Sequence, residues 1–122
     1  MSQTRETAAE PPFNLRWEGV DEAAVLVVEG EVDLVTLPTV RKELDSIAQT
    51  TSVVIDLCET SFMDSSGLRL MLAATRELDG HLHIACVPGS AVRRLIDVVL
   101  GTPTEALKLF PSRDEALAAF ST

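Results

Sequence analysis

The feature that most constrains this chain is a strand, a polar turn and a helix that follow one another between residues 52 and 78. The segment Ser52–Leu57 is apolar enough for a buried strand, and the residues from Leu68 to Leu78 have the three-and-four spacing of an amphipathic helix. Between them, Asp64-Ser65-Ser66-Gly67 places two hydroxyls and a carboxylate where the helix begins. Unpaired backbone N–H groups at such a helix start favour an anion or a phosphate.

The other segments complete an α/β pattern. Four of them have the alternation or the apolar character of strands: Phe13–Glu18, Ala24–Val28, His81–Cys86 and Leu107–Leu109. Three further helices are expected: one opening at Thr36 or Leu37, one after Pro88-Gly89-Ser90, and a last one opened by the capping box of Ser112 and Glu115. The short first connection predicts an antiparallel hairpin, and the helical crossovers that follow predict parallel, right-handed connections.

These elements predict a mostly parallel five-stranded sheet with an antiparallel N-terminal strand and about four helices. If successive strands lie side by side, the crossover helices cover one face of the sheet. The first, fourth and fifth strands alternate apolar with polar residues, so the other face is expected to be partly solvated. The 122-residue chain suggests one domain, residues 13–122, after a flexible tail over residues 1–12 that has no periodicity.

Charge and composition exclude several classes of partner. The net charge of −9 argues against direct nucleic-acid binding, which needs clustered Lys and Arg, and against binding to an anionic membrane. No apolar run approaches the ~20 residues of a membrane span, and the N-terminus lacks the apolar core of a signal peptide. We therefore expect a cytoplasmic protein in which Cys58 and Cys86 are reduced thiols.

Three segments carry a resemblance to a known family. The segment VVIDLCETSFMDSSGLRLML is similar to the signature of STAS domains, in particular of bacterial anti-sigma factor antagonists. VEGEVDLVTLPTVRKEL resembles that family's second strand, acidic turn and first helix, and AVRRLIDVVLGTPTEALKLFPSRDEALAAF resembles its C-terminal third. The segment Thr102–Glu105 is longer and more polar than expected, which leaves the register of the last strand open.

The resemblance implies a STAS-like fold and a role in partner switching. A protein of this kind binds an anti-sigma factor that is also a serine kinase, and so frees a sigma factor for transcription. The kinase phosphorylates the serine that follows the aspartate, here Ser65, and the phosphorylated protein no longer binds. A serine phosphatase removes the phosphate and restores binding. Carried over by position, Asp33 matches the acidic turn beside the site. The expected partner-binding residues are Asp33, Met63, Asp64, Ser65, Ser66 and Gly67, and no cofactor is expected.

Simple chemistry explains why one hydroxyl could act as a switch. A phosphoryl group adds a charge of about −1.5 to −2, which the start of a helix tolerates. A close interface does not tolerate it when Asp33, Asp64 and Glu59 already make the surface acidic. Phosphorylation of Ser65 is therefore expected to reduce partner affinity without unfolding the protein.

Simpler interpretations of the same residues stay open. Asp64 and the two serines could serve only as a helix cap, and Glu29, Glu31 and Asp33 could be solvated loop carboxylates, since their spacing fits no calcium loop. His81 and His83 are expected to be surface histidines on one face of a strand, without the further ligands of a zinc site. Met63, Met71 and Phe62 are expected in core or edge packing, although Met63 lies close enough to the turn to contact a partner.

Two functions other than partner switching are compatible with parts of the sequence. A serine at a strand-to-helix turn suggests a hydrolase, but the Gly-x-Ser-x-Gly frame is absent, so we do not expect an enzyme. The alternative within the fold is a STAS scaffold or sensor module of a signalling or transport complex, in which the serine is not phosphorylated.

Overall fold

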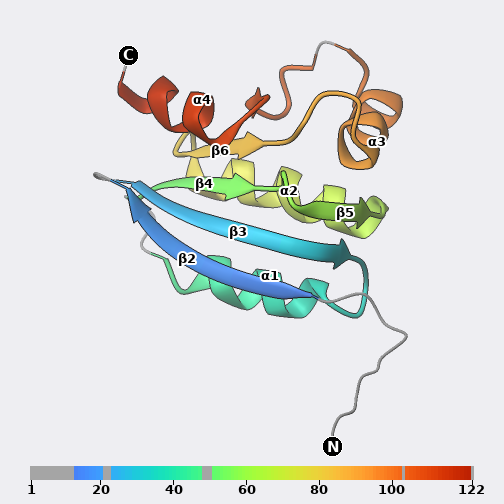
Figure 1. The fold of residues 1–122 in the computed structure, drawn as a ribbon, viewed down its shortest axis with the longest axis horizontal. Coiled ribbons are helices and arrows are strands. Elements are labelled where there is room, and N and C mark those ends of the chain that lie inside the picture. Colours follow the sequence, from blue (N-terminus) through green and yellow to red (C-terminus); the bar gives the residue numbers. More distant parts are fainter. Residues whose placement is uncertain (1–12, 21–22, 48–50, 103, 122) are drawn as a thin grey trace, which may run out of the picture.

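The computed structural model describes residues 13–20, 23–47, 51–102 and 104–121 (Figure 1). The predicted tail and the hairpin residues 21 and 22 lie outside these ranges. In chain order the elements are β2 (Asn14–Val20), β3 (Ala23–Val32), α1 (Leu37–Asp45), β4 (Ser52–Asp56), β5 (Thr60–Met63), α2 (Ser65–Leu78), β6 (Leu82–Ala85), α3 (Ala91–Leu100), β7 (Leu109–Phe110), α4 (Arg113–Ala118) and a 3-10 turn, Ala119–Ser121.

The sheet has the predicted order and one additional strand. Its main path is β2-β3-β4-β6-β7, with β2 antiparallel to β3 and the other pairs parallel, which confirms the predicted topology. The sixth strand, β5, is not predicted by the sequence pattern. It exists because β3 is ten residues long and pairs with β4 along Ala23–Val27 and with β5 along Gly30–Val32.

Helices α1, α2 and α3 pack on one face of the sheet, and the short helix α4 packs on the other (Figure 1). On the first face, Leu26 and Val28 of β3 join the large core with the inward residues of α1, α2 and α3. On the second face, Val25 and Val27 join a smaller cluster that includes Ala116 of α4. The prediction that the helices lie mainly on one face is confirmed, and the opposite face is less open than expected.

The expectation of two surface histidines is wrong for His83. Its side chain lies under α4, stacked on Phe120 with ring centroids 3.7 Å apart, and its Nδ1 lies 2.8 Å from the carbonyl oxygen of Ala116. His81 precedes β6 and is exposed, as expected. The sequence pattern did not reveal that α4 would fold over the polar side of β6.

We expect the stability of the protein to fall between pH 7 and pH 5 because of His83. Burial lowers the pKa of His83 below its usual 6.5, an effect that nearby Lys108 reinforces and the Ala116 carbonyl opposes. The unfolded chain then takes up a proton before the folded protein does, so stability is complete above pH 6.5 and is lost as the pH falls. Urea unfolding at both pH values should show this decline.

Two variants decide whether His83 is responsible. His83→Phe keeps an aromatic ring in the stack and should flatten the decline, whereas His81→Gln should retain it. An equal decline in His83→Phe would assign the effect to another group. Two paired carboxylates titrate below the range from pH 7 to pH 5. A hydrogen bond to Arg113 lowers the pKa of Glu18 from its usual 4.5, and a hydrogen bond to Ser66 lowers the pKa of Asp64 from its usual 3.8.

The C-terminal third differs from the prediction in two places. The last strand is Leu109–Phe110 rather than Leu107–Leu109, and the side chain of Leu107 is buried in the core instead. Val99 of α3, which the three-and-four spacing after Val92 and Ile96 predicts to point inward, is 54% exposed. Ser112 caps α4 as predicted, with its Oγ accepting a hydrogen bond from the backbone N–H of Glu115 at 3.2 Å.

Candidate functional site: the turn before α2

Asp64 organises the turn between β5 and α2. It is the N-cap of α2, and its Oδ1 accepts hydrogen bonds from the backbone N–H groups of Ser66 at 2.9 Å and Gly67 at 3.2 Å, and from the Ser66 hydroxyl. The Ser66 hydroxyl and these backbone groups lower the pKa of Asp64. The carboxylate is therefore ionised at neutral pH and already has its partners within the turn.

Ser65 is placed differently from its neighbour. It is the first residue of α2, it is exposed, and within the described part of the chain its hydroxyl forms no hydrogen bond. Ser66, by contrast, is half-buried and donates its hydroxyl to Asp64. Asp64 therefore caps the helix, while the Ser65 hydroxyl stays accessible. The capping interpretation and the switch interpretation are compatible.

Asp33 lies beside the turn, as the sequence suggested. The backbone N–H of Asp64 donates to the carbonyl of Val32 at 3.1 Å, which joins the start of α2 to the end of β3. The Oδ1 atom of Asp33 accepts from the backbone N–H groups of Val35 at 3.0 Å and Thr36 at 3.1 Å. Its carboxylate therefore shapes the loop from β3 to α1.

Met63 lies in the core, which confirms the expected core or edge packing and leaves little of its surface for the alternative role of a partner contact. Its side chain is 3% exposed and packs inside the core beneath the turn. Gly67 is buried above it: a Cβ atom at this position would lie 2.7 Å from Met63 Cγ and 2.9 Å from Val32 Cγ1. Both residues therefore fix the position of α2 from the core side, and the surface of the turn is formed by the residues next to them.

Gly67→Ala is expected to destabilise the protein by about 1–3 kcal/mol, because the new methyl group overpacks the contact with Val32 and Met63. The sign is opposite to that of an unhindered helical position, where alanine is favoured over glycine. Denaturant unfolding measures the change. A stabilised variant would show that the start of α2 moves freely and that this contact does not fix it.

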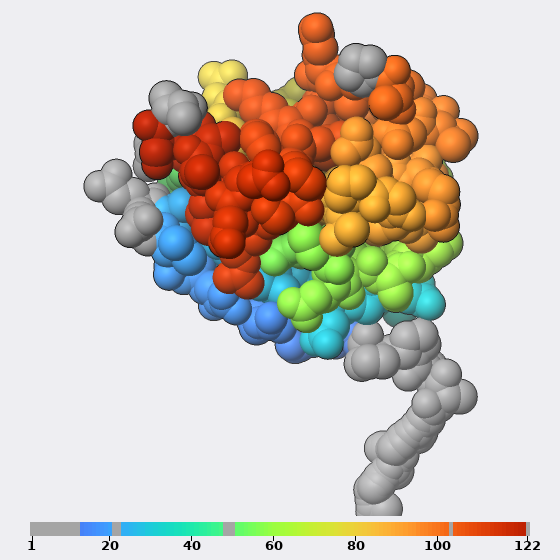
Figure 2. All heavy atoms as spheres, turned by 45° about the horizontal axis from the view of Figure 1, so that its top comes forward, coloured from blue at the N-terminus to red at the C-terminus, as the bar shows by residue number. Residues whose placement is uncertain are grey.

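Three exposed apolar side chains lie around the turn, and of these the sequence pattern draws attention only to Phe62, which is expected in core or edge packing. Leu34 and Val35, in the loop after Asp33, are 73% and 84% exposed, and Phe62 of β5 is 45% exposed. We call these three residues the apolar rim. The end of β3 and β5 form neighbouring cyan and green parts of one surface (Figure 2). Two consecutive apolar residues inside a polar turn, Asp33-Leu34-Val35-Thr36, were the available sequence signal.

Other kinds of site find no support in the structure. Among the described residues, no group of three or more His, Cys, Asp or Glu side chains could hold a metal ion. Within the same ranges, no helix is both long and apolar enough to span a membrane. Cys58, which is half-buried, and Cys86, which is buried, are not joined by a disulfide.

The arrangement of a half-covered, mostly parallel sheet with an exposed serine at the start of α2 is that of a STAS domain. The STAS family model matches residues 14–116, and the chain belongs to this family, which confirms the resemblance found in the sequence. The chain is 30% identical over 97 residues to the anti-sigma-F factor antagonist RsfB of Mycobacterium tuberculosis, a match that covers 77% of this chain and 78% of RsfB.

Solved structures agree with this assignment. An anti-sigma factor antagonist from Mycobacterium paratuberculosis has a TM-score of 0.80 at 28% identity, with 91% of this chain and 96% of that chain covered. The anti-sigma factor antagonist SpoIIAA, in its unphosphorylated form, has a TM-score of 0.61 at 21% identity, with 88% and 97% covered, and shares the fold.

Proposed function

We propose that this protein is an anti-sigma factor antagonist whose unphosphorylated form binds an anti-sigma factor with serine-kinase activity and so releases a sigma factor. Phosphorylation of Ser65 ends the binding, and a serine phosphatase restores it. The observation that carries the proposal is the exposed hydroxyl of Ser65 at the first position of α2, which forms no hydrogen bond within the described residues. The similarity to RsfB supports the same role.

The surroundings of Ser65 suit a protein interface. The apolar rim offers side chains that gain from burial against a partner, while Asp33 and Asp64 already use oxygens to hold their own loops. Asp33, Asp64, Ser65 and Ser66 are the residues we assign to the interface. Met63 and Gly67 support them from below.

A reconstitution with purified candidate anti-sigma factors and ATP tests the proposal. Mass spectrometry should locate one phosphate on Ser65, and Ser65→Ala should abolish it while Ser66→Ala should not. Phosphate on Ser66 would contradict the assignment of the acceptor. Stable binding of a partner without any phosphate would favour the alternative, a scaffold or sensor STAS module.

A hydrolytic role for Ser65 has weak geometric support. His83 is buried under α4 on the second face of the sheet, and His81 precedes β6, at the amino ends of the parallel strands. Ser65 follows the carboxyl end of β5, so neither histidine is placed to accept its proton. A fluorophosphonate probe should leave Ser65 unlabelled, and covalent capture there would favour an enzyme.

A further inference from the structure

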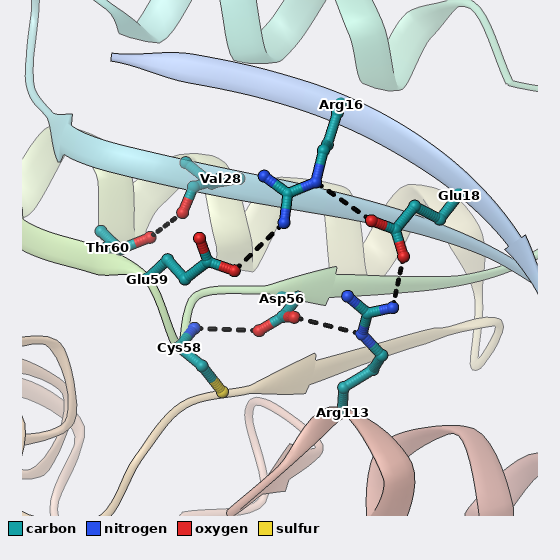
Figure 3. Close-up of polar contacts among 8 residues, drawn as sticks. All are labelled: Arg16, Glu18, Val28, Asp56, Cys58, Glu59, Thr60 and Arg113. Atoms are coloured by element: carbon teal, nitrogen blue, oxygen red, sulfur yellow. Dashed lines mark hydrogen bonds and ion pairs between the residues drawn. The ribbon is translucent and has the colours of Figure 1, made fainter. Parts of the chain in front are cut away.

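Five charged side chains form a continuous circuit on the second face of the sheet (Figure 3). Arg113, the first residue of α4, places its Nε 3.4 Å from Asp56 Oδ2 and pairs through Nη1 with Glu18. Glu18 Oε2 lies 3.0 Å from Arg16 Nε, and Arg16 Nη2 lies 3.2 Å from Glu59 Oε2. The circuit joins β2, the end of β4 and α4.

The circuit begins and ends on the same turn. Asp56 and Glu59 are the two ends of the connection from β4 to β5, and this connection delivers the chain to Ser65. Asp56 Oδ1 accepts the backbone N–H of Cys58 at 2.9 Å, and the Thr60 hydroxyl donates to the carbonyl of Val28 at 2.8 Å (Figure 3). Both sides of the turn are therefore tied down.

The circuit also lies over apolar side chains. In the pairing of the strands, Val27 of β3 lies between Arg16 and Asp56, and Val25 is the partner of Glu18. Val25 and Val27 are fully buried although α4 is only six residues long. Long charged side chains can cover apolar surface with their methylene groups while their heads stay paired.

The members of the circuit differ in burial, and this predicts which of them matters most. The Asp56 side chain is 5% exposed, so removal of Arg113 would leave a nearly buried carboxylate without its cation. Arg16 and Glu59 are 41% and 44% exposed, so their pair contributes less and is screened by salt. Arg113 is the only described member that contacts both Asp56 and Glu18.

We propose that this circuit is a brace that couples α4 to the segment carrying Ser65, with Arg113 as the positioning residue. When one of these ion pairs is lost, the turn from Asp56 to Glu59 becomes free to move. Ser65 then loses the position that partner binding requires. The coupling of α4 to the turn is inferred from the ion pairs and hydrogen bonds described above. Its consequence for partner binding rests on the proposed function.

The alkylation rate of Cys58 measures the brace without any partner. Cys58 lies inside the braced turn, where burial and then Asp56 raise its pKa to about 12 and Arg113 opposes this shift. Loss of the Arg113 charge alone would therefore slow labelling, because the thiolate is the reactive form, so faster labelling reports opening of the turn. Arg113→Gln should raise the labelling rate about tenfold, and Glu59→Gln about two- to fivefold. Peptide mapping separates Cys58 from the fully buried Cys86.

Three control variants separate the brace from simple covering by α4. Glu59→Gln and Arg16→Gln open the far side of the circuit without touching α4, and both should raise labelling while the melting temperature stays near that of the wild type. Arg41→Gln removes an exposed cation that pairs with Asp45 and Glu77, outside the circuit, and should change nothing. Faster labelling in Arg113→Gln alone would overturn the brace, because α4 would then only cover the thiol.

The functional arm measures affinity for an anti-sigma factor that binds the wild-type protein. Arg113→Gln should weaken binding about three- to tenfold, and Arg113→Lys should rescue it only in part, because one ammonium group cannot reproduce the guanidinium fork. Faster labelling with unchanged affinity would overturn the coupling to Ser65. Absence of wild-type binding to every candidate would instead count against the proposed function, and Cys58 labelling would still decide the brace.

Discussion

Phosphorylation of Ser65 is expected to weaken binding to the anti-sigma factor at least ~100-fold, which corresponds to about 2.7 kcal/mol. The added charge of about −1.5 to −2 would stand beside Asp33 and Asp64, in an interface that must exclude water from the apolar rim. Calorimetry or surface plasmon resonance with stoichiometrically phosphorylated protein measures the loss. Ser65→Ala should retain binding and resist the kinase.

The same modification should leave the fold intact. Ser65 is the first residue of α2, where the helix dipole favours negative charge by about 0.3–1 kcal/mol. Arg69 lies one turn further along the helix, is exposed, and pairs with no acidic side chain in the described part of the chain, so it can approach the phosphate. The phosphoprotein should melt at the same temperature as the unmodified protein or higher.

Two comparisons make this expectation specific. Arg69→Gln should remove any stabilisation of the phosphoprotein, while Arg76→Gln, exposed in the last turn of the same helix, should not. Ser65→Asp is the weaker mimic, because aspartate carries less charge than phosphate. If the phosphoprotein binds as tightly as the unmodified protein, Ser65 is not the switch.

Much of the fold was predictable because it depends on local patterns. Ser112 and the proline after Leu37 mark helix starts by chemistry that acts within one turn, and both helices begin as expected. The alternation of helices and strands likewise determined the parallel order of the sheet. These features need no knowledge of distant residues.

The missed features all depend on contacts between distant segments. Strand β5 forms because β3 extends to Val32, beyond the predicted end at Val28. His83 is buried because α4, thirty residues later, folds over β6 and brings the Ala116 carbonyl to its ring. An alternating pattern shows which residues share a face, but it does not show what covers that face.

The candidate site shows the same division. The cap by Asp64 and the exposure of Ser65 follow from the strand-turn-helix pattern, and the structure agrees with both. Core packing of Met63 was predictable, but proximity in sequence to the turn does not reveal that its side chain lies beneath Gly67. Leu34 and Val35 were passed over because exposed apolar residues carry no periodic signal.

The apolar rim leads to the second large expected effect. Val35→Asp should weaken binding to the anti-sigma factor about 30-fold or more, since it introduces a charge into the proposed interface at a position that is 84% exposed. The melting temperature should stay within experimental error of the wild type, because the side chain packs against little of its own fold. Val98→Asp on α3 is the matched control: Val98 is also 84% exposed and lies outside the rim. Equal affinity losses in both variants would indicate a general charge effect, and unchanged binding by Val35→Asp would remove the rim from the interface and leave Ser65 and its polar neighbours to account for recognition.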